Sequence, residues 1–118
     1  EAAFRVREKS MLTRLLAGSS SVIATGGGAV LDPGNRRMIA ENSLAIWLHA
    51  SSRLCLARVG NGSGRPLLEG RDPFEQLEKL SREREPLYAH VADWLYPVAD
   101  SVPEKIVEEL DYEIRFSC

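Results

Sequence analysis

The order in which β-rich and helical segments alternate along the chain most constrains its fold. Three short apolar runs have the length and composition of buried strands, and they are residues 21–25, 44–49 and 94–98. Helical spacing or helix-start residues predict helices at residues 2–17, 35–42, 53–59, 73–89 and 103–110. Strands that alternate with helices favour an α/β fold with a parallel sheet.

Length and composition limit the class of protein. The 118 residues suffice for one small domain with a single core, so we expect one domain over residues 1–118. The net charge of −2 indicates neither nucleic-acid binding nor a membrane surface, and no apolar run approaches the ~20 residues that span a bilayer. The two cysteines form no disulfide framework or metal site. We therefore expect a cytoplasmic protein without a nucleic-acid or membrane partner.

Three consecutive glycines, Gly26, Gly27 and Gly28, follow the predicted strand at residues 21–25. Glycine has no Cβ, so another group can approach its backbone closely. Ligands of open α/β sheets lie at the carboxyl ends of the strands. The triplet therefore indicates either a ligand against bare backbone or a tight turn, although a turn needs only one or two glycines.

Three segments with arginine are further candidates for binding an anion. Arg5 and Glu8 share a helical face, where they form either part of a site or a surface ion pair worth under ~1 kcal/mol. The glycine-rich loop at residues 60–70 carries Arg65 and is typical either of a lid over anionic groups or of a solvated loop. The run "RERE", which contains Arg84, is otherwise typical of a solvated helix face.

In this order, the segments "FRVRE", "VIATGGGAV", "GRPLL" and "REREPLYAHVAD" resemble those of shikimate kinases, and the resemblance runs from residue 1 to about residue 110. It implies a three-layer P-loop kinase fold of the nucleoside-monophosphate-kinase type with a parallel sheet. It also implies transfer of the γ-phosphoryl group of ATP to the 3-hydroxyl of shikimate, in aromatic amino-acid (chorismate) biosynthesis. ATP and Mg²⁺ are the implied cofactors, and a monomer is the implied state.

The same resemblance assigns roles to the candidate residues. The shikimate-binding residues that it implies are Arg5, Glu8, Gly26, Gly27, Gly28 and Arg84. The two arginines would bind the carboxylate of shikimate, and Glu8 would orient Arg5. The backbone N–H of Gly27 would approach the substrate, and its neighbouring glycines would give it clearance. Two arginines on one carboxylate would both hold and aim the ring.

Two further arginines would contact ATP. Arg65, in the lid at residues 60–70, would meet the phosphates and stabilise charge on the transferring group, which is a catalytic role. Arg58 would lie along the adenine. The family holds its phosphates and metal with the motif G-x-x-x-x-G-K-[ST] and an Asp-x-Asp segment, and the 118 residues contain no such phosphate loop. The resemblance therefore implies no metal ligand in this chain.

The missing motif has a structural and a functional consequence. In the family the phosphate-loop strand lies between the strands that match residues 22–25 and 44–49, so we expect both to lack their shared neighbour here. We expect an N-terminal βα unit to be absent from this chain, so that the full-length protein is a shikimate kinase and this chain alone is inactive. The alternative is a catalytically inactive shikimate-kinase-like binding or regulatory domain.

Overall fold

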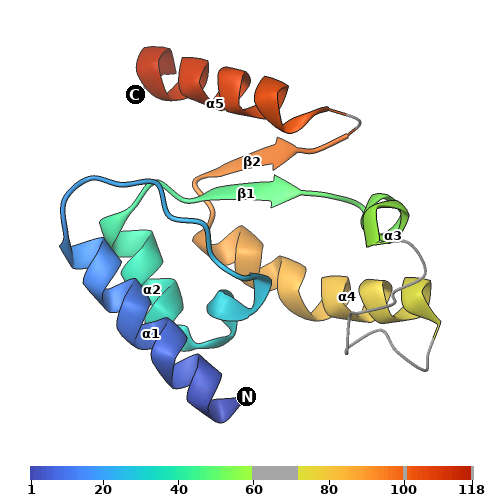
Figure 1. Cartoon of the computed structure of the whole chain (residues 1–118), viewed down its shortest axis with the longest axis horizontal. Helices are drawn as coiled ribbons and strands as arrows, with labels where there is room; N and C mark the ends of the chain where they lie inside the picture. The colour runs from blue at the N-terminus through green and yellow to red at the C-terminus, as the bar shows by residue number, and fades with distance from the viewer. Residues whose placement is uncertain (60–71, 100, 118) are drawn as a thin grey trace.

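The computed structural model describes residues 1–59, 72–99 and 101–117. Its helices are α1 (Ala2–Ala17), the 3₁₀ helix η1 (Gly27–Leu31), α2 (Pro33–Asn42), α3 (Ser52–Val59), α4 (Pro73–Val91) and α5 (Pro103–Ser117). Its strands are β1 (Ile46–His49) and β2 (Trp94–Pro97). Figure 1 shows the two strands side by side, with α5 along one side of the pair and α4 on the other. The described residues therefore form helical layers around a small sheet, as the alternating pattern predicts.

The two strands pair in parallel. Ile46 lies opposite Trp94, and the register continues to His49 opposite Pro97. The chain between them forms α3 and α4, in keeping with the crossover connection that parallel strands require. At the far end of the ladder the backbone N–H of Val98 donates to the carbonyl of His49 over 2.7 Å. The predicted strands at residues 44–49 and 94–98 are confirmed, with slightly shorter bounds.

The predicted strand at residues 21–25 is wrong. No strand is formed there, and Val22 is fully exposed. β1 pairs with β2 on one edge, and no described strand lies beside residues 21–25 to complete a ladder with them. An apolar run without a hydrogen-bonding neighbour has no ladder to hold it as a strand. This agrees, for the described residues, with the expectation that this segment lacks its neighbour.

The helices agree with the predicted ranges to within two residues, except at the end of α5. Helix α1 has the predicted bounds, and α2 begins at Pro33 because the carboxylate of Asp32 accepts hydrogen bonds from the N–H groups of Gly34 and Asn35, over 2.6 and 3.1 Å. The predicted ends of α4 and α5 are too early, since these helices run to Val91 and Ser117.

Side-chain pairs four residues apart support the unpredicted turns of α5. Arg115 lies 2.9 Å from Asp111, and the rings of Tyr112 and Phe116 are 4.8 Å apart. The tail after residue 110 is therefore helical as far as Ser117, which corrects the prediction of a helix ending at residue 110.

The buried apolar residues lie where the helices meet η1 and the end of β2. They are Leu12, Ala29, Val30, Val91 and Val98. Burial of Ala29 and Val30 anchors η1, and with it the glycines that begin this helix. Apolar side chains on the strands stay more exposed, with Leu48 at 52% and Leu95 at 54%. Within the described ranges, no helix has both the length and the apolar character needed to span a membrane.

Candidate active site

Arg5 and Glu8 lie side by side on α1. The guanidinium Nη1 of Arg5 donates to Oε1 of Glu8 over 2.8 Å, and its Nε donates to Glu1 over 3.1 Å. The hydrogen bond that Arg5 donates to Glu8 is the main reason that the pKa of Arg5 is raised above its ordinary value. Only 13% of the Glu8 side chain is exposed, so this is not the fully solvated surface pair considered above. Arg5 therefore stays positively charged in this site.

The glycine triplet lies directly beneath this pair. A Cβ built on Gly28 would lie 2.7 Å from Nη1 and 2.8 Å from Cζ of Arg5, which is closer than real Cβ contacts come. A Cβ on Gly26 would lie at an ordinary 3.6 Å from Oε2 of Glu8. The guanidinium of Arg5 therefore covers the bare Cα of Gly28, and any side chain at this position would require the guanidinium to move.

Helix α4 brings a second arginine to the triplet from the opposite side. Arg84 and Tyr88 are four residues apart and share one helical face. A Cβ on Gly27 would lie 3.2 Å from Nη1 of Arg84 and 3.0 Å from the hydroxyl of Tyr88. That hydroxyl donates to the carbonyl of Gly27 over 2.8 Å. Among the described residues Arg84 has no ion-pair partner, so its charge is free to bind an anion.

Two side chains of helix α2 donate hydrogen bonds to carbonyl groups of η1. The side-chain amide of Asn35, only 2% exposed, donates to the carbonyl of Ala29 over 3.0 Å. Arg36 donates to the carbonyl of Val30 over 2.7 Å. Neither residue was predicted from the sequence, and Tyr88 was predicted only as part of the motif around Arg84. The one sequence signal for Tyr88 was its spacing of four residues from Arg84.

The structure brings together all the residues predicted to bind shikimate, which are Arg5, Glu8, Gly26, Gly27, Gly28 and Arg84. The two residues predicted to contact ATP are not part of this cluster. Arg58 lies exposed in the last turn of α3, and no contact joins it to the glycines. Arg65 and the predicted lid at residues 60–70 lie outside the described residues.

A pocket of about 220 Å³ borders this cluster, between β1, α3 and α4. Arg84 and Tyr88 form part of its wall, together with Trp47 and His49 of β1. His49 lies 3.3 Å from the carboxylate of Glu85. The arginine therefore lines an open cavity next to the glycines.

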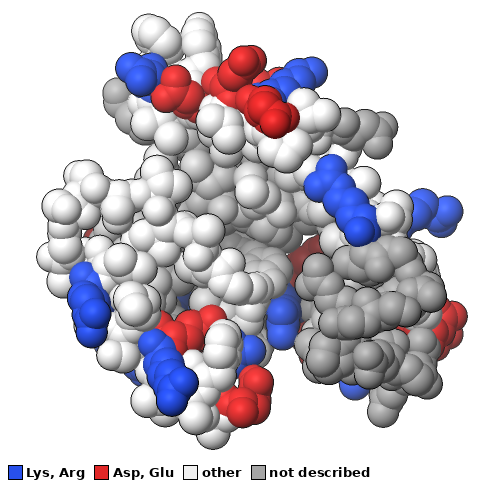
Figure 2. Space-filling model, in the orientation of Figure 1, with Lys and Arg blue, Asp and Glu red and all other residues white. Residues whose placement is uncertain are grey.

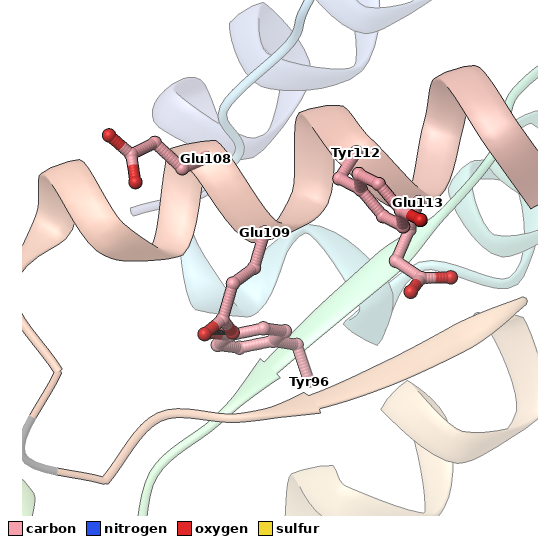
Figure 3. Close-up of a pocket in the computed structure, with 5 residues that line it drawn as sticks. All are labelled: Tyr96, Glu108, Glu109, Tyr112 and Glu113. Carbon is pink, nitrogen blue, oxygen red and sulfur yellow. Dashed lines mark hydrogen bonds between the residues drawn. The ribbon is translucent and has the colours of Figure 1, made fainter.

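A larger pocket of about 390 Å³ lies away from the cluster, between β2 and α5, and Figure 3 shows its lining residues. Glu109 reaches from α5 to Tyr96 of β2, and their hydrogen bond raises the pKa of Tyr96 above its ordinary value. Three glutamates and two tyrosines line this pocket, without a basic side chain. An acidic wall repels carboxylates and phosphates, so the glycine cluster is the better candidate for an anionic ligand.

On the visible face, the charges of the described residues do not single out another anion site. On the face shown in Figure 2, basic and acidic side chains are interspersed over the helices rather than gathered in one basic patch. Within the described ranges, no group of three or more His, Cys, Asp or Glu residues could hold a metal ion. The described residues therefore do not fit a Mg²⁺ site.

Helices around a parallel sheet define an α/β protein, and two arginines from different helices lie over its glycine triplet. The sequence profile of the shikimate kinase family matches residues 1–115. The chain belongs to the shikimate kinase family, and its fold is the P-loop kinase fold of that family.

Relatives support this assignment over nearly the whole chain. A shikimate kinase from Pseudomonas aeruginosa (strain LESB58) is 39% identical over 115 residues, which are 98% of this chain and 67% of that protein. One from Paramagnetospirillum magneticum (strain ATCC 700264 / AMB-1) is 43% identical over 107 residues, 91% of this chain and 54% of that protein.

A solved structure gives the same result. A shikimate kinase from Acinetobacter baumannii, in complex with shikimate, superposes with a TM-score of 0.86 at 29% identity, covering 99% of this chain and 65% of that protein. The chain thus spans about two thirds or less of the length of these three proteins.

Proposed function

We propose that the full-length protein is a shikimate kinase, which transfers the γ-phosphoryl group of ATP to the 3-hydroxyl of shikimate. The observation that carries this proposal is the convergence of Arg84 and the Arg5–Glu8 pair on the glycine triplet. The similarity to a kinase solved in complex with shikimate supports the choice of substrate.

In this proposal the arginines bind and aim the substrate. Arg84 and Arg5 donate charge-assisted hydrogen bonds to the carboxylate of shikimate, which are stronger than neutral ones. Glu8 keeps the guanidinium of Arg5 in place through the 2.8 Å hydrogen bond. The backbone N–H of Gly27 then approaches the ring, next to the guanidinium of Arg84. Because its carboxylate end is fixed, the ring presents its hydroxyl in one orientation to the phosphoryl donor.

The part of the reaction that involves ATP rests on the family resemblance. ATP supplies the phosphoryl group, and Mg²⁺ accompanies it in the full-length protein. We assign to Arg65 the stabilisation of charge on the transferring group and to Arg58 a contact with adenine. Arg65→Ala is then expected to lower kcat about 100-fold or more while shikimate KM changes little. Single-substrate titrations measure both constants, and an unchanged kcat would remove Arg65 from the mechanism.

The proposal is tested with the full-length protein, ATP and shikimate. ADP release, followed by a coupled assay, is expected to depend on shikimate, and phosphorus NMR is expected to detect a new phosphate monoester. The methyl ester of shikimate is the matched control, because it keeps the hydroxyls but lacks the negative charge that the arginines bind. Equal turnover of acid and ester would contradict the proposed binding mode, and no turnover of the acid would contradict the function.

The alternative is a shikimate-binding or regulatory domain without catalysis. This alternative requires a full-length protein without a working phosphate loop. Titration calorimetry separates the two functions. Shikimate binding by a full-length protein that does not phosphorylate it would support the alternative.

We also propose that the full-length protein is a cytoplasmic monomer. The resemblance to shikimate kinases suggests the monomer, and the ordinary composition and cysteine content suggest the compartment. Sedimentation equilibrium of the purified protein tests the first statement, and fractionation of cells tests the second. A concentration-independent dimer would contradict the monomer.

A further inference from the structure

We propose that Tyr88 is a positioning residue, whose hydroxyl fixes the glycine triplet relative to Arg84. This inference rests on the proposed function, because it concerns how the shikimate site is held in shape. It assigns to Tyr88 no contact with the reacting atoms.

Tyr88 connects three elements of the fold. Its ring belongs to α4 and packs against Trp47 of β1, with ring centroids 5.6 Å apart and planes inclined by 48°. Its hydroxyl donates to the carbonyl of Gly27, at the start of η1, over 2.8 Å. The side chain is half-buried. The ring is therefore held by the strand while the hydroxyl holds the glycine backbone.

The same geometry couples Gly27 to Arg84. The side chains of Arg84 and Tyr88 share a face of α4 and are separated by about 6 Å along its axis, the rise of four helical residues. A Cβ on Gly27 would lie 3.0 Å from the Tyr88 hydroxyl and 3.2 Å from Nη1 of Arg84, so both side chains lie over the side of Gly27 where a Cβ would be. Fixing Gly27 against Tyr88 therefore also fixes its separation from the arginine.

Among the residues that the structure describes, no other side chain holds the glycine end of η1 in this way. Asn35 and Arg36 hold the later carbonyls of Ala29 and Val30. Within the described ranges, the hydrogen bond from Tyr88 is the only one from a side chain to the backbone of the triplet. Three glycines in sequence have wide conformational freedom, so this end of η1 depends on an external restraint. Loss of the hydroxyl is expected to let Gly27 shift relative to Arg84.

The test is Tyr88→Phe in the full-length protein, because phenylalanine keeps the ring against Trp47 and removes only the hydroxyl. Shikimate KM is expected to rise about 3- to 10-fold, the effect of losing one hydrogen bond that fixes the site. ATP KM is expected to stay within about twofold. Tyr96→Phe is the matched control, since it removes a tyrosine hydroxyl bonded to Glu109, outside the glycine cluster.

Each outcome decides the inference. A selective rise in shikimate KM for Tyr88→Phe, absent in Tyr96→Phe, supports it. An unchanged shikimate KM overturns the inference about Tyr88 but leaves the proposed function intact. An equal rise in both Michaelis constants with a lower melting temperature also overturns it, because that result marks a purely structural role. A wild-type protein that is inactive with shikimate overturns the proposed function, and Tyr88 as a shikimate-positioning residue with it.

Discussion

At the scale of single residues, the packing of Arg5 on Gly28 allows a substitution that is expected to weaken shikimate binding without lowering the stability of the fold. Gly28→Ala would place a Cβ 2.7 Å from Nη1 of Arg5, and the flexible end of that side chain can move away. Gly28 has no positive φ, so alanine brings no backbone strain. We expect shikimate KM to rise about tenfold, the effect of one weakened charge-assisted bond, while the melting temperature changes little.

Gly26→Ala is the matched control for this prediction. Its Cβ would lie 3.6 Å from Oε2 of Glu8, an ordinary contact. Steady-state kinetics and thermal melts of both variants provide the comparison. Equal KM values for the two alanine variants would show that Arg5 does not act through its place on Gly28.

Arg84 carries the second prediction at this scale. Arg84→Ala removes a guanidinium that has no ion-pair partner among the described residues, so little internal structure depends on it. We expect shikimate KM to rise about 10- to 100-fold, with a much smaller change in ATP KM. Arg82→Ala, on the exposed side of the same helix, is the control. Equal effects of Arg84→Ala on both substrates would count against the assignment.

The residues of the candidate site could be predicted from sequence only where a motif contains them. The order of the arginine and glycine motifs identified Arg5, Glu8, Arg84 and the triplet, and the structure brings these together. Tyr88 was missed as a contact because it meets a carbonyl 61 residues earlier in the chain. Helical spacing tells which residues share a face, but not which backbone group lies opposite that face.

At the scale of elements, the start of α2 is capped by the carboxylate of Asp32, which can be protonated in acid. The pKa of Asp32 is lowered, first by the hydrogen bond from the backbone N–H of Asn35 and then by Lys9. A lowered folded pKa means that the cap's stabilisation is complete above the unfolded value, near 3.8, and is lost as the pH falls through the lower folded value. This element therefore weakens only in acid.

Asp32→Ala tests that statement. We expect a lower melting temperature than wild type at pH 7, because two N–H groups of α2 lose their acceptor. The difference is expected to shrink as the pH falls below 3.8. Circular dichroism melts over that range measure it, and Asp32→Asn, which keeps an accepting oxygen, is the control. A difference that is constant with pH would exclude the ionised cap as its cause.

Elements were predictable where their own residues determine them. Helix α1 depends on local spacing and has the predicted bounds, whereas α2 begins at Pro33, two residues before its predicted start, because Asp32 caps it. Residues 21–25 have the composition of a strand, yet a strand needs a neighbour that local sequence does not provide. The end of α5 was missed for another reason, since the pairs Asp111–Arg115 and Tyr112–Phe116 extend a helix past the last strongly apolar turn.

At the scale of the whole molecule, the small sheet leaves apolar surface uncovered. β1 has one described neighbour, β2, and Leu48 and Leu95 are both more than half exposed. Phe116 and Val107 of α5 are exposed as well, at 71% and 65%. We expect the 118-residue chain on its own to bind the apolar dye ANS and to self-associate as its concentration rises, because exposed apolar surface and a free strand edge favour association.

Dye fluorescence and sedimentation velocity measure this behaviour. Leu48→Lys should reduce both dye binding and association, since a charge on an edge strand opposes pairing with another chain. Lys79→Arg, a change of one cation for another on α4, is the control. A chain that stays monomeric at high concentration without binding the dye would show that the exposed side chains do not act as a sticky surface.

The guanidinium that rests on Gly28 has a consequence for mutational scanning of this family. A library scored for protein abundance would count Gly28→Ala as permissive, since only the end of a flexible side chain must move. The same library scored by growth that depends on enzyme flux would count it as damaging. Positions with a high abundance score and a low growth score would therefore identify the backbone that lies under the arginines. They would locate the candidate substrate-binding site without a structure of a bound ligand.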